Sequence, residues 1–279
     1  MAISDVSLTS GMRNNLMQLQ GTSKLIDRTQ ERLSTGRKVN SALDNPTNYF
    51  AAQAANNRAG DLGIRKDGMS EAIQTVKASN SGVTAISALV EAAKGIAAAA
   101  LGTSNTTDRS GFAAQYNTLM SQIDFLASDS GYRGTNLLTS ATMTVTFNED
   151  GISKLQVIGF SANSSGLGIS TASDFQSTNF GWAGTGDADI TFDQARLGSA
   201  TNTLRNESKN LANNLNIITS RQTFTDSMIS TLQTGADNLT LADMNEEGAN
   251  MLMLQTRQSL GTTALSLSSQ AAQSVLRLF

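Results

Sequence analysis

The sequence predicts a mainly α-helical protein: a long antiparallel helical bundle or coiled-coil rod built from both chain ends, with a small central insertion containing a β-hairpin. Three observations predict this class. Apolar residues recur in alternating steps of three and four over long stretches near both ends, which is the seam of a heptad helix. The single proline, Pro46, leaves those stretches uninterrupted. Strand-forming residues first cluster beyond about residue 139.

The last stretch, residues 251–279, predicts a helix roughly 43 Å long. Polar or small residues, Gln258, Gly261 and Ser268, interrupt its apolar stripe. So thin a stripe is a poor core on its own, and we expect a partner to bury it. Its apolar seam positions are Met251, Leu254, Leu265, Val275 and Phe279.

The first helix is predicted over about residues 7–36, ending at Gly36. Its stripe is thin in the same way, with Ser23 and Gln30 in the seam. Two such helices at opposite ends of the chain can pair, and their interrupted seams indicate further partners outside the chain. The apolar seam positions of this helix are Met12, Leu16, Leu19, Ile26 and Leu33.

Two longer helices lie inside these ends. Asn45 and Pro46 predict an N-cap and first helical position for a helix that reaches about Leu101, irregular in its first third because of three glycines. A shorter helix follows near residues 112–126. Helix returns with Asp193 as the expected N-cap, bends or ends at residues 235–238, and restarts at Asp243. The packing positions are Ile73, Val76, Val83 and Val90 on one side and Leu204, Leu211, Leu215, Ile218, Ile229 and Leu232 on the other.

The middle of the chain changes character. Residues 143–147 alternate like a strand, residues 148–151 carry a turn signal, and residues 152–160 can return as a second strand, which predicts a β-hairpin. Residues 161–189 are rich in glycine, serine and threonine. We interpret them as surface loop, which predicts that residues 161–187 tolerate insertions.

Composition excludes several classes of function. The 279 residues include no histidine and no cysteine, which excludes histidine-dependent catalysis, imidazole metal sites, disulfides and thiolate chemistry. A net charge of −3 gives no basic patch for nucleic acid. No run of eighteen apolar residues predicts a membrane span, and the first residues do not resemble a cleaved secretory signal. We expect no cofactor and no enzyme activity.

Three groups of residues, in order along the chain, resemble bacterial flagellin. The resemblance covers nearly the whole chain apart from about residues 139–190, and its specificity comes from the order and spacing of the strings. They are Arg32-Leu33-Ser34-Thr35-Gly36 with Val39-Asn40-Ser41-Ala42 and Asp44; Gln122-Ile123-Asp124 with Tyr132, Gly134 and Asn136-Leu137-Leu138; and Gln270-Ala271 with Gln273-Ser274-Val275-Leu276.

The resemblance implies a subunit that polymerises with itself into the hollow helical filament of the bacterial flagellum. It implies type III export without signal cleavage, an export chaperone, a filament cap and hook-associated proteins as partners, and an extracellular location. It divides the chain into an inner tube, residues 1–40 and 241–279, a helical rod, residues 41–138 and 191–240, and a variable outward-facing β-rich insertion, residues 139–190. The terminal seams would then be polymerisation surfaces and the inner stripes the packing of the rod.

One alternative stays open from the sequence, and a second is excluded by composition. The hook–filament junction protein resembles flagellin at both ends and differs in the middle. Some flagellin relatives carry a zinc protease insertion, whose metal motif requires histidines that this chain lacks. The acidic pairs Glu149-Asp150 and Asp187/Asp189 are better interpreted as solvated turns than as a carboxylate site.

The resemblance also carries an expectation about immune detection. Flagellins sensed by the animal Toll-like flagellin receptor bear an arginine-rich motif on the first inner helix. This chain has Ala92 and Lys94 where the family's two arginines stand, and Gly95 where a glutamate stands. Because neither side chain offers the planar donor fork of arginine, the altered motif predicts weak activation of that receptor.

Overall fold

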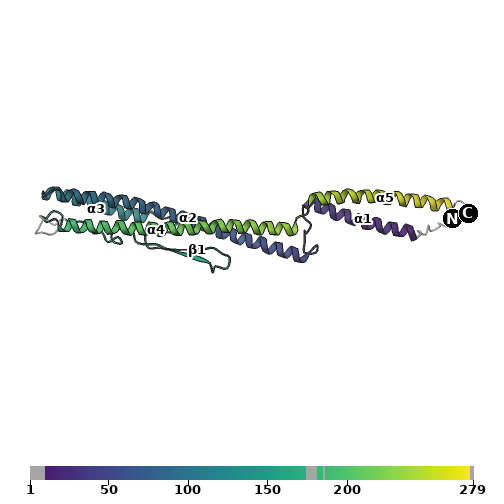
Figure 1. Ribbon diagram of the computed structural model, residues 1–279, viewed down its shortest axis with the longest axis horizontal. Coiled ribbons are helices and arrows are strands. Elements are labelled where there is room, and N and C mark those ends of the chain that lie inside the picture. The colour runs from purple at the N-terminus through teal and green to yellow at the C-terminus, as the bar shows by residue number, and fades with distance from the viewer. Residues whose placement is uncertain (1–9, 174–180, 185, 277–279) are drawn as a thin grey trace. The chain divides into compact units, whose positions relative to one another are not determined.

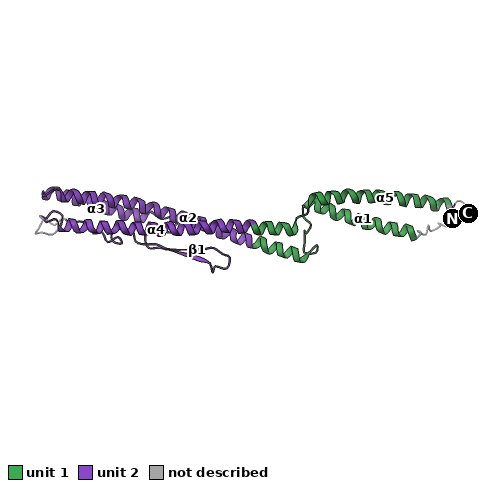
Figure 2. Cartoon of the chain, viewed as in Figure 1, with its two compact units in different colours: residues 1–57, 231–279 green, residues 58–230 purple. Residues whose placement is uncertain are grey.

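The computed structural model describes residues 10–173, 181–184 and 186–276, and only the backbone at residues 272, 275 and 276. These residues form five helices and one antiparallel pair of strands (Figure 1), which confirms the mainly α class with a small hairpin. Two compact units share the chain (Figure 2): unit 1 is Met1–Asn57 with Thr231–Phe279, and unit 2 is Arg58–Ser230.

Unit 1 is built around α1 (Ser10–Thr35) and α5 (Met244–Leu276), which lie side by side (Figure 1). Gly36 ends α1 in the left-handed region at φ +69°, and its N–H bonds to the carbonyl of Arg32 at 2.8 Å. Asp243 caps α5 as predicted, because its Oδ1 accepts from the N–H groups of Asn245 at 2.9 Å and Glu246 at 3.3 Å.

The connections that follow α1 and precede α5 pair with each other. The N–H of Lys38 donates to the carbonyl of Thr240 at 2.8 Å, and the N–H of Ala242 donates to that of Gly36 at 3.0 Å. A helix break at residues 235–238 is wrong: α4 (Ala188–Thr240) runs through this stretch. Gly235 lies on an exposed face, where a helical glycine costs only about 1 kcal/mol, and the adjacent Ala236 is buried.

In unit 2 the helices α2 (Pro46–Leu101), α3 (Thr106–Asp129) and α4 enclose one apolar core. The bounds of α2 agree with the prediction, and the Oδ1 of Asn45 accepts from the N–H of Asn48 at 3.1 Å as an N-cap should. The three glycines at positions 60, 63 and 68 do not interrupt this helix. The three helices contribute to this core the large, fully buried side chains of Met69, Ile86, Tyr116, Met120, Ile123, Ile190, Leu197, Leu204 and Ile218.

Polar contacts fix the antiparallel register of α2 and α4. Lys66 pairs with Asp226 at 2.6 Å, and the amide of Gln222 donates to the hydroxyl of Ser70 at 2.7 Å. Farther along, the hydroxyl of Ser208 donates to Asn80 Oδ1 at 2.9 Å. Because residue numbers fall on α4 as they rise on α2, the two stripes predicted from the sequence meet along the unit.

The start of α4 differs from the prediction. The helix begins at Ala188, so Asp193 is an internal, buried residue and not the N-cap. Its carboxylate accepts from the indole N–H of Trp182 at 2.8 Å, an interaction across the preceding loop that a local sequence pattern cannot indicate.

Within α2, an 18-residue window has a mean hydropathy of 1.5, enough by length and composition to cross a membrane. The core helix of a soluble protein meets the same criterion. The apolar side of this helix faces the core of unit 2, with Ile86, Val90, Ala93 and Ala97 fully buried.

The predicted hairpin is present as β1 (Thr142–Thr146) and β2 (Lys154–Ile158), paired antiparallel with Thr144 opposite Gln156. Val145 and Val157 face the helices and are buried. The segment after the hairpin is not a simple surface loop. Asn117 on α3 exchanges two hydrogen bonds with the backbone of Ala172, at 2.7 and 2.9 Å, and Leu167, Ile169, Ala172, Trp182 and Ala183 are buried.

Candidate assembly surface

The seam between α1 and α5 is thin, as its sequence predicted. Among the side chains of this helix pair that the structure describes, only Met12, Thr29, Glu247 and Leu254 are buried. A close approach occurs at Gly261, where an added Cβ would lie 2.7 Å from Leu19 Cδ2. The half-buried seam residues are Leu19, Ile26, Leu33, Met251 and Leu265, while Leu16 is exposed; no side chain is described for Val275, and Phe279 lies outside the described residues.

One ion pair fixes the register of the two helices. Arg32 near the end of α1 pairs with Glu247 in the first turn of α5 at 2.7 Å. The carboxylate is only 10% exposed, and it lies at a helix N-terminus, where the helix dipole favours negative charge. A buried charge without its partner would be costly, so this pair penalises any slip of one helix along the other.

A second apolar stripe runs along α5 outside its seam with α1. It consists of Leu252, Leu260 and Leu267, which are 68%, 65% and 67% exposed. Steps of eight and seven residues place these leucines within one side of a helix, opposite Leu254 and Leu265. A helix that is apolar on both sides is normally buried. This exposed stripe was not among the seams predicted from the sequence, although the spacing of its leucines could have revealed it.

Further exposed apolar side chains and an open groove accompany the stripe. Met17 and Leu25 on α1 and Met253 on α5 are 61%, 40% and 46% exposed. The groove, of about 780 Å³, runs between the two helices and is lined by Leu25, Leu260, Arg257 and their neighbours. Contiguous exposed apolar surface of this kind marks sites of protein–protein contact.

Most of the packing residues predicted in the inner helices belong to the core of unit 2 or pack against it, and the exceptions are Ile229 and Leu232. Ile73, Val76, Val83, Val90, Leu204, Leu211 and Ile218 are buried, and Leu215, Ile229 and Leu232 are half-buried. The altered receptor motif lies on α2 outside this core, and its Lys94 is half-buried. Ala92 and Gly95 are exposed, and Lys94 pairs with Glu91 at 2.8 Å, so weak receptor activation stays a prediction.

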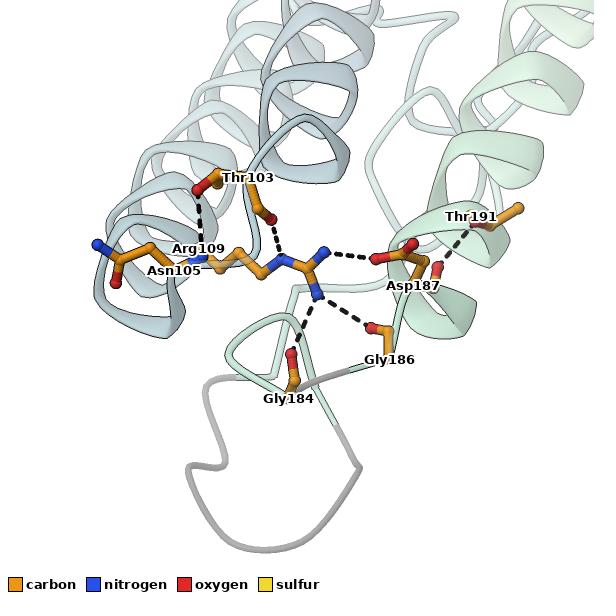
Figure 3. A network of polar contacts seen from close by, with 7 residues as sticks. All are labelled: Thr103, Asn105, Arg109, Gly184, Gly186, Asp187 and Thr191. Carbon is orange, nitrogen blue, oxygen red and sulfur yellow. Dashed lines mark hydrogen bonds and ion pairs between the residues drawn. The ribbon is translucent and has the colours of Figure 1, made fainter.

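An arginine that the sequence analysis did not single out organises one end of unit 2 (Figure 3). The Arg109 side chain is only 4% exposed and pairs with Asp187. Its guanidinium also donates to the carbonyls of Thr103 at 2.6 Å, Gly184 at 3.1 Å and Gly186 at 3.3 Å. The planar fork thus joins the start of α3 to the start of α4, and Asp187, which remains exposed to solvent, serves as its counter-ion.

The described residues contain no group of three or more histidine, cysteine, aspartate or glutamate side chains that could hold a metal ion. The polar residues of this chain act as caps and cross-links between helices, as at Asp243, Asn117 and Arg109. Surface apolarity, concentrated on α1 and α5, is therefore the feature that most needs a functional explanation.

Comparisons with known proteins support one family. The family model described as the bacterial flagellin N-terminal helical region matches residues 3–144. The flagellins FljM and FljK of Caulobacter vibrioides are each 28% identical to this chain, with all of both chains covered. A flagellin of Brucella melitensis is 25% identical over 95% of each chain. The crystal structure of Bacillus cereus flagellin matches 57% of this chain and 88% of its own, with 17% identity and a TM-score of 0.46.

Proposed function

The chain belongs to the bacterial flagellin family, and from this premise we propose that the exposed apolar residues of α1 and α5 are the surfaces through which its copies polymerise. The protein is a structural subunit of the flagellar filament. The observation that carries the proposal is the stripe of Leu252, Leu260 and Leu267, three leucines about two-thirds exposed on a helix whose other side packs on α1.

Physical reasoning supports a polymer over a closed dimer. Apolar side chains occur on more than one side of the α1–α5 pair, so one partner helix cannot cover them all. Contacts between unlike surfaces of identical chains, repeated without closing, give an open helical filament. The apolar area left exposed in one copy then becomes the driving force for adding the next.

The test is a matched pair of substitutions on exposed positions of α5. Leu260→Asn removes a leucine whose burial contributes roughly 1.5–3 kcal/mol, so the monomer concentration needed for polymerisation should rise about tenfold or more. Gln255→Asn, on the same helix but outside both the seam and the leucine stripe, changes an exposed polar residue and should leave that concentration unchanged. Sedimentation of the polymerised protein measures the monomer concentration that remains in solution for each variant. Wild-type polymerisation by Leu260→Asn would remove the proposed role of the stripe.

Hydrogen exchange on the wild-type chain tests the same proposal without a substitution. We expect fast amide exchange over α1 and α5 in the monomer, because the thin seam offsets little of the backbone entropy of about 1–2 kcal/mol per ordered residue. The same amides should become strongly protected in filaments. Strong protection already present in the monomer would mean that the pair is stable alone.

The finer functional assignments rest on the family. We propose an extracellular filament assembled after type III export, with an export chaperone, a filament cap and hook-associated proteins as partners, and no enzymatic role. We also propose the division into inner-tube and rod segments at residues 40, 138, 190 and 240. The copy number distinguishes this assignment from the hook–filament junction protein: filaments sheared from cells should contain this chain as their bulk component.

A further inference from the structure

The outer edge of β1 is open. Two backbone hydrogen bonds show which residues bond across the hairpin. The N–H of Phe147 donates to the carbonyl of Ser153 at 2.8 Å, and the N–H of Gly159 donates to the carbonyl of Ala141 at 2.9 Å. By the alternation of an antiparallel pair, Thr142, Thr144 and Thr146 point their N–H and C=O groups away from β2. Among the described residues these groups have no hydrogen-bond partner, and the sheet has only two strands.

A groove of about 460 Å³ lies beside this edge, between β1 and α2. Residues Met143–Thr146 form its strand side, and Ile64, Arg65 and Gly68 contribute to its helix side. The open edge spans roughly 13 Å at about 3.4 Å per residue. A groove alongside an unpaired edge has the geometry that accepts one more strand, a recurrent mode of peptide recognition.

Arg65 is the unsatisfied polar residue of the groove. Its Nε is buried without a hydrogen-bond partner in the described part of the chain, and its guanidinium forms no ion pair there. The other arginine of the groove, Arg133, already pairs with Glu71. Buried donors are normally bonded, and a guanidinium fork matches a carboxylate.

Gly68 leaves the helix side of the groove open. A Cβ built on it would meet nothing within 4 Å, so no contact inside the chain requires glycine here. A glycine inside a helix is intrinsically unfavourable relative to alanine. Because Gly68 has no side chain, however, another backbone can come close to α2 beside Arg65.

We propose that this groove binds an extended segment of a second copy of this chain, which adds a strand to β1 and places a carboxylate on Arg65. The inference rests on the proposed polymerisation, because in a polymer each copy is surrounded by other copies. Charge favours it as well, since Asp and Glu outnumber Lys and Arg by 23 to 20 in the chain while the groove holds an unpaired cation. The added strand would bond the outward N–H and C=O groups of Thr142, Thr144 and Thr146.

The experiment compares residue-resolved amide exchange in monomers and in filaments assembled from the purified chain alone. We expect the amides of Thr144 and Thr146 to exchange at least a hundredfold more slowly in filaments. The outward amides of β2, at Gln156 and Ile158, are the internal control and should change little. Filaments of the purified chain contain no other protein, so selective protection of β1 identifies a second copy as the occupant.

Two matched pairs of variants locate the contact. Arg65→Gln and Gly68→Ala should raise the polymerisation concentration several-fold and restore fast exchange at Thr144. The controls lie on the same helix outside the groove: Lys77→Gln also removes one positive charge, and Gly60→Ala also fills an open glycine site. Both controls should polymerise like the wild type.

Three results would overturn the inference. Filaments in which Thr144 and Thr146 exchange as in the monomer would show the edge unpaired, leaving the proposed polymerisation intact. Equal protection of both hairpin edges would indicate general covering and not strand addition. A wild-type chain that forms no filaments would overturn the proposed function together with this inference.

Discussion

At the scale of single residues, the buried polar groups of unit 2 have structural roles that the sequence did not reveal. Asp193 accepts the indole N–H of Trp182, whose ring packs on that of Tyr116 with centroids 4.7 Å apart. Burial raises the pKa of the Asp193 carboxyl, and the Trp182 hydrogen bond and the nearby Arg196 oppose this only in part. The hydroxyl of Tyr116 has no hydrogen-bond partner among the described residues, and burial raises the pKa of this phenol as well.

The raised pKa of Asp193 predicts a pH-dependent stability. Its stabilising contribution is complete below the unfolded pKa and is lost as pH rises through the higher folded pKa, because the folded state prefers the protonated acid. Asp193→Asn keeps an oxygen for the Trp182 N–H without the charge. We expect this variant to equal or exceed the wild type at pH 7, by up to about 1 kcal/mol, with the advantage vanishing in acid.

Urea unfolding of the monomer at several pH values between 4 and 7 measures the difference. Asp189→Asn is the comparison variant, because that half-buried carboxylate also accepts a bond near Trp182, from the Gly181 N–H at 2.6 Å. A loss of stability in Asp193→Asn at pH 7 that disappears in acid would show instead that the charge itself is required.

Replacement of the buried Arg109 should change the stability of unit 2 more than replacement of Asp193. Replacing it with methionine keeps much of its length but leaves the carbonyls of Gly184 and Gly186 without their donor. We expect a loss of roughly 2 kcal/mol, less than for a fully buried ion pair because Asp187 is 61% exposed. Arg109→Lys should recover only part of this loss, since an ammonium cannot reproduce the fork. Thermal unfolding measures both variants, and an unchanged melting temperature in Arg109→Met would contradict this role.

At the scale of elements, the predictions succeeded where the pattern is long and repetitive. The stripes of α2 and α4 and the caps at Asn45 and Asp243 were predictable because periodicity and capping are local properties of the chain. The segment after the hairpin was not predictable, because its order comes from bonds such as Asn117 to Ala172 that join distant residues. The start of α4 was misplaced for the same reason. The open edge of β1 could not be predicted either, because it depends on which residues pair between the two strands.

The anchored segment changes the expected tolerance to insertions. An eight-residue tag after Ser165 would separate the bonds that Ser164 makes to Asp124 from the buried Leu167 and Ile169. Each of those apolar side chains contributes roughly 1.5–3 kcal/mol when buried, so we expect a strongly destabilised unit 2. The same tag after Asp150, in the exposed hairpin turn, lengthens a loop at a cost of only about 0.6 kcal/mol per doubling. Thermal unfolding of both proteins decides, and equal stability would contradict the anchoring argument.

At the scale of the whole molecule, the two units differ in how much of their apolar surface they bury. Unit 2 encloses a continuous core from α2, α3, α4 and the hairpin, so we expect it to fold without the α1–α5 pair. The α1–α5 pair of unit 1 buries few side chains and leaves Leu252, Leu260 and Leu267 exposed. Polymerisation therefore has the most apolar surface to bury on the α1–α5 pair, because the single chain covers those side chains least.

This contrast predicts separable effects of truncation. A chain ending at Leu241 lacks α5, so α1 loses both its apolar partner and the Glu247 carboxylate that pairs with Arg32. We expect no filaments by electron microscopy, together with rapid proteolysis of residues 10–35. Unit 2 should keep its melting temperature within about 3 °C, because none of its core residues lies in the deleted segment. A large drop in that temperature would show that the core of unit 2 depends on α5. Normal filaments would show that polymerisation does not need the leucine stripe.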